Sequence, residues 1–305
     1  MQDILIHEVG LRDGLQMEAR TVPTARKLLW LRMLMNSGVD IIQVGSFVHP
    51  AKVPQMADTD SLFAELAASG EKPAHVTLSG LVLNEKGLER GLACGVEMFC
   101  MGVSASETHS RKNTGMSIAE ATETIIAVAH RATAAGRRVQ VSVQSAFGCG
   151  YEGKVPQERV LAIVRRYCDE GVKNISLADT AGHAVPDQVE RMFSAIMALD
   201  AEIDLACHFH NTYGLGLANA YAALKAGAGS FESSVAGLGG CPFTKIAGGN
   251  VCTEDLVHMF RTMGFRRDVN LDQLIGVAKE MGKFFGREMP GMVYRTGTLN
   301  EAGAR

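Results

Sequence analysis

The stretch IDLACHFHNTYGLGLANAYAALKAGAGSFESSVAG, residues 203–237, contains one complete strand–helix–strand unit. The apolar run at 203–210 is typical of a buried strand, ANAYAALKAG (218–227) has a helical pattern, and 230–237 predicts the next strand. A glycine follows the helix just before the second strand, which is a common signal for the end of a helix. Two strands joined through a helix pair in parallel with a right-handed crossover.

The same unit recurs along the chain. Further strands are predicted at 4–10, 39–47, 75–83, 96–104, 138–147 and 174–179, and further helices at 24–38, 117–136 and 158–171. About eight such units predict an α/β fold of the closed (β/α)8 barrel type. An open doubly wound sheet is the alternative, but no GxGxxG stretch follows the first strand.

The length of 305 residues fits one barrel domain, with the barrel at about 4–260 and a C-terminal helical extension at about 261–305. The hydrophobic fraction of 47% supports a large aliphatic core. The net charge of −3 and the absence of a basic stripe argue against a nucleic-acid partner. No apolar run is long enough to span a membrane, and MQDILIHEV leads directly into a strand, so a cytoplasmic protein is expected.

Polar residues follow the predicted strands at their carboxyl ends, where barrel enzymes carry their active sites. These residues are Arg12, Asp13 and Gln16 after the first strand, Ser46 and His49 after the second, His109, Arg111, Lys112 and Asn113 after the fourth, Asp179, Thr180 and His183 after the sixth, and the Gly-rich loop GLGGCPFTKIAGGN after the eighth.

His208 and His210 lie two residues apart on the seventh strand, so both side chains point to the same face. Barrel closure brings the first, seventh and eighth strands together, and Asp13 and Asn250 then join the two imidazoles. Such a mixed nitrogen and oxygen site suits a divalent cation, Mg²⁺ or Mn²⁺ first, with Co²⁺ or Zn²⁺ as further options. It is also similar to the two-histidine, one-carboxylate site of non-haem iron oxygenases, which is an alternative of another class.

Seven segments together resemble the 3-hydroxy-3-methylglutaryl-CoA lyases, which are TIM-barrel metallolyases. They are HEVGLRDGLQ, IIQVGSFVHP, SASETHSRKN, AFGCGYEGKV, ISLADTAG, HFHNTYG and VAGLGGCPFTKIAGGNVCTEDLV, in this order from about residue 4 to 260. The GLGGCP loop followed by GN favours the lyases over the related condensing synthases.

The resemblance implies that Asp13, His208, His210 and Asn250 hold a divalent cation. It implies that Arg12 stabilises the enolate oxygen of a thioester and that Cys241 acts in acid–base chemistry on a mobile loop. We expect Arg12, Cys241, His208 and Asp179 to be catalytic.

The expected substrate-binding residues are Gln16, Gln43, Ser46, Gln144, Lys112 and Asn113. Ser46 is also expected to support the catalytic residues, and Arg111, Lys112 and Asn113 are candidates for contacts with the coenzyme A tail. A solvated basic loop is the other interpretation of the last three residues.

The chemistry of these residue types agrees with such a reaction. Cleaving a 3-hydroxyacyl-CoA between C2 and C3 requires loss of a weakly acidic hydroxyl proton, and a cation lowers the pKa of bound oxygen groups. A permanently charged guanidinium stabilises the enolate that leaves. A thiol with an ordinary pKa near ~8.5 can then supply a proton to carbon.

Four features depart from the lyase pattern. Gln43 replaces the usual Glu, Asn211 replaces Asp after the HxH pair, and Met17 replaces Asn. On the fifth strand, Gln140, Ser142 and Gln144 stand where the lyases usually carry Arg, Tyr and Ser. The metal ligands and the cysteine loop are intact, so the resemblance supports the reaction class more firmly than the acyl group.

The predicted activity is a divalent-metal-dependent carbon–carbon lyase that converts 3-hydroxy-3-methylglutaryl-CoA to acetoacetate and acetyl-CoA. Citramalyl-CoA, which would give pyruvate and acetyl-CoA, is the alternative substrate. A condensing synthase, an iron oxygenase and a metal-binding protein without catalysis are the competing functions. The expected partner is an acyl-CoA, with neither nucleic acid nor membrane, and the sequence leaves open whether the protein forms a homo-oligomer.

Overall fold

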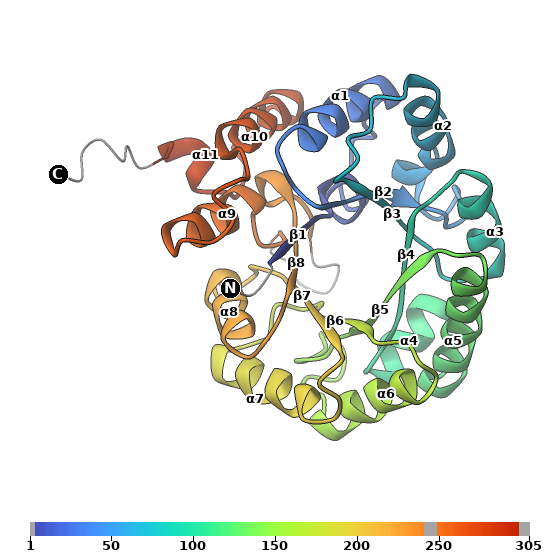
Figure 1. The fold of residues 1–305 in the computed structure, drawn as a ribbon. Coiled ribbons are helices and arrows are strands. Elements are labelled where there is room, and N and C mark those ends of the chain that lie inside the picture. Colours follow the sequence, from blue (N-terminus) through green and yellow to red (C-terminus); the bar gives the residue numbers. More distant parts are fainter. Residues whose placement is uncertain (1–3, 241–248, 299–305) are drawn as a thin grey trace.

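The computed structural model describes residues 4–240 and 249–298. Eight parallel strands in these residues form a closed barrel in sequential order, which confirms the predicted fold (Figure 1). The strands are β1 (Leu5–Glu8), β2 (Ile41–Ser46), β3 (Thr77–Leu81), β4 (Met98–Ser104), β5 (Arg138–Gln144), β6 (Asn174–Asp179), β7 (Asp204–Phe209) and β8 (Ser230–Ser233). The open-sheet alternative is excluded because β1 pairs with both β2 and β8.

Helices surround the barrel, as the strand–helix alternation predicts (Figure 1). Those between the strands are α1 (Thr24–Met35), α2 (Thr59–Ser69), α3 (Glu85–Ala93), α4 (Glu107–Thr114), α5 (Ile118–Ala134), α6 (Gln157–Asp169), α7 (Pro186–Met197) and α8 (Gly216–Lys225). The glycines that follow α1, α6 and α8, namely Gly38, Gly171 and Gly227, have positive φ angles of 88°, 75° and 101°. This left-handed conformation ends a helix at little cost only for glycine.

After β8 the chain continues into α9 (Thr253–Thr262), α10 (Leu271–Phe285) and α11 (Val293–Thr296). Helix α10 packs against α1 and α9, so this part of the chain covers the barrel beside β1 and β8 (Figure 1). The C-terminal helical segment is therefore present as the sequence predicts. None of the described helices is long and apolar enough to cross a lipid bilayer.

The main hydrophobic core fills the layer between the barrel and the helices, with Trp30, Phe99 and Phe231 among its fully buried members. Side chains alternate along each strand, so every second strand residue points away from this layer and into the barrel. A second, small apolar cluster of Ile41, Met98 and Cys100 lies on that inner side. The barrel interior thus has an apolar plug beneath a more polar layer.

Several strands end before the residue that the sequence pattern indicates, and β1 and β8 are the two next to the proposed site. Strand β1 ends at Glu8, and a single π-helical turn, η1 (Gly10–Gly14), follows because the Val9 carbonyl accepts the N–H groups of three successive residues, Arg12, Asp13 and Gly14. Strand β8 ends at Ser233 and passes into a 3-10 turn, η3 (Val235–Gly237). The other irregular turn is η2 (Pro54–Met56).

Glu8 connects these two turns. Its buried carboxylate accepts the backbone N–H of Gly10 at 2.6 Å and that of Val235 at 3.0 Å, and it also accepts the hydroxyl of Thr253. The turn that carries Arg12 and Asp13 is thereby fixed to the end of β8.

Candidate active site

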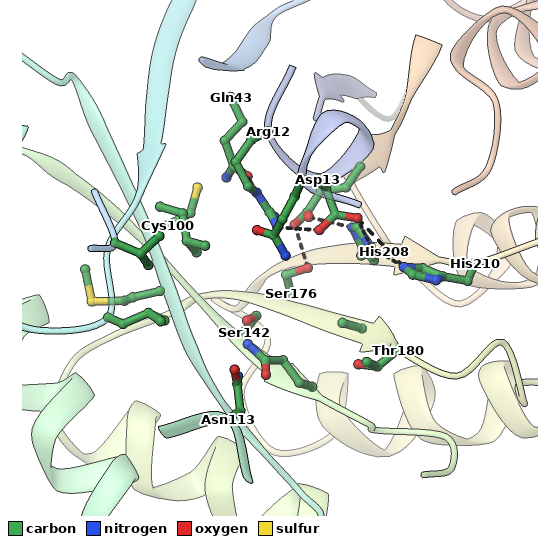
Figure 2. A pocket seen from close by; sticks show the side chains of 18 of the residues that line it. Arg12, Asp13, Gln43, Cys100, Asn113, Ser142, Ser176, Thr180, His208 and His210 are labelled. Atoms are coloured by element: carbon green, nitrogen blue, oxygen red, sulfur yellow. Dashed lines mark hydrogen bonds and ion pairs between the residues drawn. The ribbon is translucent and has the colours of Figure 1, made fainter. Parts of the chain in front are cut away.

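A cavity of about 360 Å³ opens at the carboxyl ends of the barrel strands (Figure 2). Strands β2 to β8 all contribute residues to the cavity wall, and the turn η1 contributes in place of β1. The predicted residues that line it are Arg12, Asp13, Gln16, Gln43, Lys112, Asn113, Gln144, His208 and His210. Residues far apart in the sequence therefore meet in one chamber, at the end of the barrel where the sequence predicts the site.

Among the described residues, Asp13, His208 and His210 form a cluster whose ligand atoms lie close enough together to hold a metal ion. The Asp13 Oδ2 atom lies 3.7 Å from His208 Nε2 and 3.9 Å from His210 Nε2, and the two Nε2 atoms are 3.2 Å apart. Figure 2 shows the carboxylate and both imidazoles turned toward one another on one side of the cavity. The predicted convergence of η1 and β7 is thus confirmed.

Asn250 lies at the edge of this cluster, beside Asp13 and His210. Its Nδ2 donates to Asp13 Oδ2 at 2.9 Å and to the carbonyl of Leu238 at 3.0 Å, while its buried Oδ1 has no hydrogen-bond partner among the described residues. An unpartnered buried oxygen is costly, and a cation is one group that would satisfy it. Asn250 also forms a backbone bridge with His210, which places it next to the two imidazoles.

Glu232 on β8 is a functional residue that the sequence analysis did not select. Its Oε2 lies 3.0 Å from His208 Nδ1, and its Oε1 accepts the Ser176 hydroxyl at 2.7 Å. Burial lowers the pKa of His208, but the hydrogen bond with Glu232 and the charge of Asp13 outweigh it and raise that pKa. When the imidazole is deprotonated, the Glu232 carboxylate keeps the remaining proton at Nδ1, so Nε2 presents its lone pair toward Asp13 and His210. The sequence carried a signal for this residue, because Glu232 is the only ionisable residue in the strand segment SFESSVAG.

The charges around the cluster are arranged for a cation. Burial raises the pKa of Asp13, but Arg12, His208 and His210 outweigh it and hold that pKa well below its usual range. Burial, together with the nearby His208, lowers the pKa of His210 to about 4. Asp13 is therefore ionised and His210 neutral near pH 7, the states in which each group ligates a metal.

Arg12 lies between the metal cluster and β2. Its Nη1 donates to Asp13 Oδ1 and its Nε donates to Gln43 Oε1. Gln43 thus supports the guanidinium as an amide, in the place where the sequence analysis noted the loss of a carboxylate. Figure 2 shows Arg12 and Gln43 side by side above the cluster.

Three predicted site residues of the described chain, Asp179, Ser46 and Asn250, are not among those that line the cavity. Asp179, at the end of β6, is buried, and its carboxylate accepts the backbone N–H groups of His183 at 2.8 Å and Ala184 at 3.1 Å. Ser46, at the end of β2, is fully buried. Asp179 therefore holds the loop after β6, whereas the Ser46 hydroxyl has no hydrogen-bond partner among the described residues. Cys241 lies outside the described residues.

The basic segment after β4 divides into two parts. Lys112 and Asn113 line the cavity, and the Lys112 ammonium lies 4.3 Å from the ring centre of Tyr151. Arg111 instead pairs with Glu107 on the same helix at 2.8 Å. Of the three residues predicted to contact the coenzyme A tail, Lys112 and Asn113 therefore line the cavity and Arg111 does not, and the contact itself stays a prediction.

Comparisons with known proteins agree with this geometry. The family model described as HMGL-like matches residues 3–281. The chain belongs to the HMGL-like family. It is 37% identical to a hydroxymethylglutaryl-CoA lyase of Bacillus subtilis over 94% of this chain and 95% of that protein. It is also 35% identical to an (R)-citramalyl-CoA lyase of Chloroflexus aurantiacus over 98% of this chain and 96% of that protein.

This chain superposes with a TM-score of 0.91 on a solved structure of an HMG-CoA lyase from Acinetobacter baumannii in complex with coenzyme A and 3-methylmalate. It is 34% identical and the match covers 98% of this chain and 96% of that one. The resemblance predicted from the seven segments is thus confirmed at the level of the family.

The four departures noted in the sequence have different positions in this HMGL-like chain. Gln43 and the three β5 residues, Gln140, Ser142 and Gln144, all line the cavity. Met17 also borders it and is 44% exposed. Asn211 instead accepts the N–H of Gly216 at 2.9 Å, where α8 begins. The substitutions therefore concentrate on the cavity wall at β2 and β5.

Proposed function

We propose that this protein is a divalent-metal-dependent carbon–carbon lyase that cleaves a 3-hydroxyacyl-CoA between C2 and C3 and releases acetyl-CoA. The observation that carries the proposal is the convergence of Asp13, His208 and His210 beside Arg12 in one cavity. A cation-binding cluster and a permanently charged guanidinium are the two stabilising groups that such a cleavage needs. Relatives named as lyases of two different acyl-CoA substrates support the same reaction class.

The residues proposed to hold the cation are Asp13, His208, His210 and Asn250. One carboxylate, two imidazoles and one amide oxygen favour Mg²⁺ or Mn²⁺, with Co²⁺ or Zn²⁺ as alternatives. When bound, the cation supplies positive charge that lowers the pKa of a hydroxyl group at the site. Glu232 orients His208 for this role through its Nδ1–H.

Arg12 is proposed to stabilise the negative charge that develops on the thioester oxygen. As the C2–C3 bond breaks, its electron pair moves into the thioester enolate. The 3-hydroxyl group gives its proton to water and becomes a carbonyl. The Arg12 guanidinium is fixed by Asp13 and Gln43 before substrate binds. A donor already held in position stabilises the transition state without reorganisation.

Cys241 is proposed to complete the reaction by delivering a proton to C2 of the enolate, which gives acetyl-CoA. The Gly-rich sequence around it suits a loop that closes over the substrate. Lys112 and Asn113, at the cavity, are proposed to contact the coenzyme A portion, since an ammonium and an amide suit phosphate and polar groups.

Two acyl groups follow from the comparisons and from the sequence. Cleavage of 3-hydroxy-3-methylglutaryl-CoA would give acetoacetate and acetyl-CoA, and cleavage of citramalyl-CoA would give pyruvate and acetyl-CoA. Each reaction keeps the same metal cluster and the same enolate, so the two differ only in the group attached to C3.

The test is to measure acetyl-CoA release from both thioesters by the purified protein with Mg²⁺, with Mn²⁺, and after chelation. We expect release that depends on the added cation and is lost in His208→Ala. A protein that binds the cation but cleaves none of the thioesters would contradict the proposal. Turnover that requires both Fe²⁺ and O₂ would instead support the oxygenase alternative.

A further inference from the structure

The cavity wall formed by β4 and β5 carries neutral polar groups, in contrast to the charged groups around Asp13, His208 and His210. Gln140, Ser142 and Gln144 alternate along β5 and all line the cavity, and Gln140 is the deepest of the three because the carboxyl end of β5 lies at the mouth. Cys100, paired with Gln140 on β4, lines the same wall. Figure 2 shows Cys100 and Ser142 on the side of the pocket away from His210.

Gln140 has an unused hydrogen-bond donor at this wall. The residue is only 3% exposed, and its Nε2 has no hydrogen-bond partner among the described residues. Its Oε1 faces the Cys100 thiol at 3.7 Å. A buried amide N–H without a partner costs free energy, and a ligand oxygen in the cavity would remove that cost.

The charged groups that line the cavity lie elsewhere in the described chain. The Arg12 guanidinium is engaged by Asp13 and Gln43. Lys112 comes from α4, beyond the carboxyl end of β4, and stacks on Tyr151. Glu232, an anion, faces His208 and Ser176 at the floor.

A carboxylate that reached Gln140 would therefore lose its water and face neutral hydrogen-bond donors. At the adjacent Cys100 thiol, the charges of both Glu232 and Arg12 are felt, and that of Glu232 is the stronger. A buried charge without a partner of opposite sign is strongly unfavourable. A neutral carbonyl or amide oxygen would accept the Gln140 N–H without that cost.

We propose that Gln140 determines acyl specificity and selects substrates whose group distal to the cleaved bond is polar but uncharged. This inference rests on the proposed lyase reaction. It keeps the cleavage step but changes the preferred distal group from the carboxylate of the two acyl groups named above to a neutral polar group. The distal oxygen accepts the Gln140 N–H, while Ser142 and Gln144 provide further neutral contacts nearer the mouth.

A matched pair of substrates isolates the charge. The first is 3-hydroxy-3-methylglutaryl-CoA, and the second is its analogue in which the distal carboxylate is a carboxamide of the same shape. Cleavage gives acetyl-CoA from both, with acetoacetate from the first and acetoacetamide from the second. We expect the wild-type kcat/KM to be about 10-fold or more higher for the carboxamide, the effect of one well-made hydrogen bond against an unpaired charge.

Two variants locate the effect at Gln140. Gln140→Arg should move the ratio of the two kcat/KM values by about 10-fold or more toward the carboxylate, because it adds a charge-assisted donor. Gln140→Met keeps the volume but removes the donor, and should lower kcat/KM for the carboxamide more than for the carboxylate. The melting temperature and the Mn²⁺ affinity of both variants check that fold and metal cluster are intact.

The outcomes separate this inference from the lyase proposal. If the wild-type protein cleaves the carboxylate thioester faster than the carboxamide, the specificity inference is wrong and the lyase proposal stands. If it cleaves neither these nor citramalyl-CoA with any added cation, the lyase proposal itself fails. Should the ratio stay the same in folded Gln140→Arg and Gln140→Met, Gln140 does not contact the distal group.

Discussion

The two sides of the cavity are built on different principles. The side of η1, β7 and β8 contains pairs of charged or ionisable groups, such as Arg12–Asp13 and His208–Glu232. On the side of β4 and β5, the polar groups are neutral, and the Gln140 amide has an unpartnered donor. The first side carries the groups proposed to hold a cation and to stabilise an enolate, and the second side carries neutral hydrogen-bonding groups.

Because of this difference, residues that select the substrate can be substituted without disturbing the residues proposed to carry out the reaction. Each charged group on the metal side depends on the others for its ionisation state, so one substitution there disturbs the whole set. A neutral wall lacks this interdependence, and its residues can change while the reaction is preserved. The departures from the lyase pattern that line the cavity are Gln43, Met17 and the three β5 residues, and none of them is a proposed metal ligand, which agrees with this division.

The largest expected effect comes from His208→Ala. The variant removes one of the three clustered ligands and leaves Glu232 without its imidazole partner. We expect no detectable Mn²⁺ binding by calorimetry and no measurable acetyl-CoA release. Gln144→Asn on the opposite wall is the matched control and should retain Mn²⁺ binding. Retained Mn²⁺ binding in His208→Ala would show that the cluster is not the cation site.

Arg12→Met should lower kcat by ~10²–10³, the usual effect of removing one preorganised donor from a developing oxyanion. The wild-type and variant proteins are compared by steady-state kinetics at saturating metal. Because Asp13 would lose the guanidinium beside it, the metal affinity is measured in parallel. A kcat within threefold of wild type would contradict the role of Arg12.

Glu232→Gln should weaken cation affinity by ~10–100-fold, because it removes the carboxylate that fixes the proton of His208 at Nδ1. Titration of the variant with Mn²⁺ measures the effect directly, without reference to turnover. Ser176→Ala, which removes only the hydroxyl on the other oxygen of Glu232, is the control and should change the affinity less. Equal affinities in wild type and Glu232→Gln would remove Glu232 from the site.

The smallest effect is expected behind the metal side, at Glu8. Burial raises its pKa to about 7, despite the hydrogen bonds from Thr253, Val235 and Gly10. The folded state therefore holds the proton more tightly than the unfolded state, and this contribution to stability is complete below pH ~4.5 and lost as pH rises through ~7.

The stability of wild type relative to Glu8→Gln should accordingly fall with rising pH between these values, by at most about 3 kcal/mol. Urea unfolding of both proteins at pH 4.5, 6 and 8 measures this difference. A difference that stays constant with pH would mean that Glu8 does not titrate in this range.

The sequence by itself determined the barrel and half of the site. Periodic apolar runs with glycine-ended helices are local signals, and they suffice for the order of strands and helices. The i, i+2 spacing of His208 and His210 likewise puts both on one face without knowledge of any other strand. The strand ends at Glu8 and Ser233 were displaced from the pattern because the Glu8 carboxylate makes tertiary contacts that shape η1 and η3.

Only the tertiary structure decided which side chains become partners. Barrel closure places β8 beside β7, so Glu232 reaches His208 Nδ1, whereas Asp179 turns to its own loop although it also ends a strand. Whether Gln140 is satisfied or unpartnered likewise depends on atoms far away in the sequence. Periodicity fixes the face of the strand on which a side chain lies. A hydrogen bond between strands requires donor and acceptor atoms to come within about 3 Å, and those distances are set only when the barrel closes.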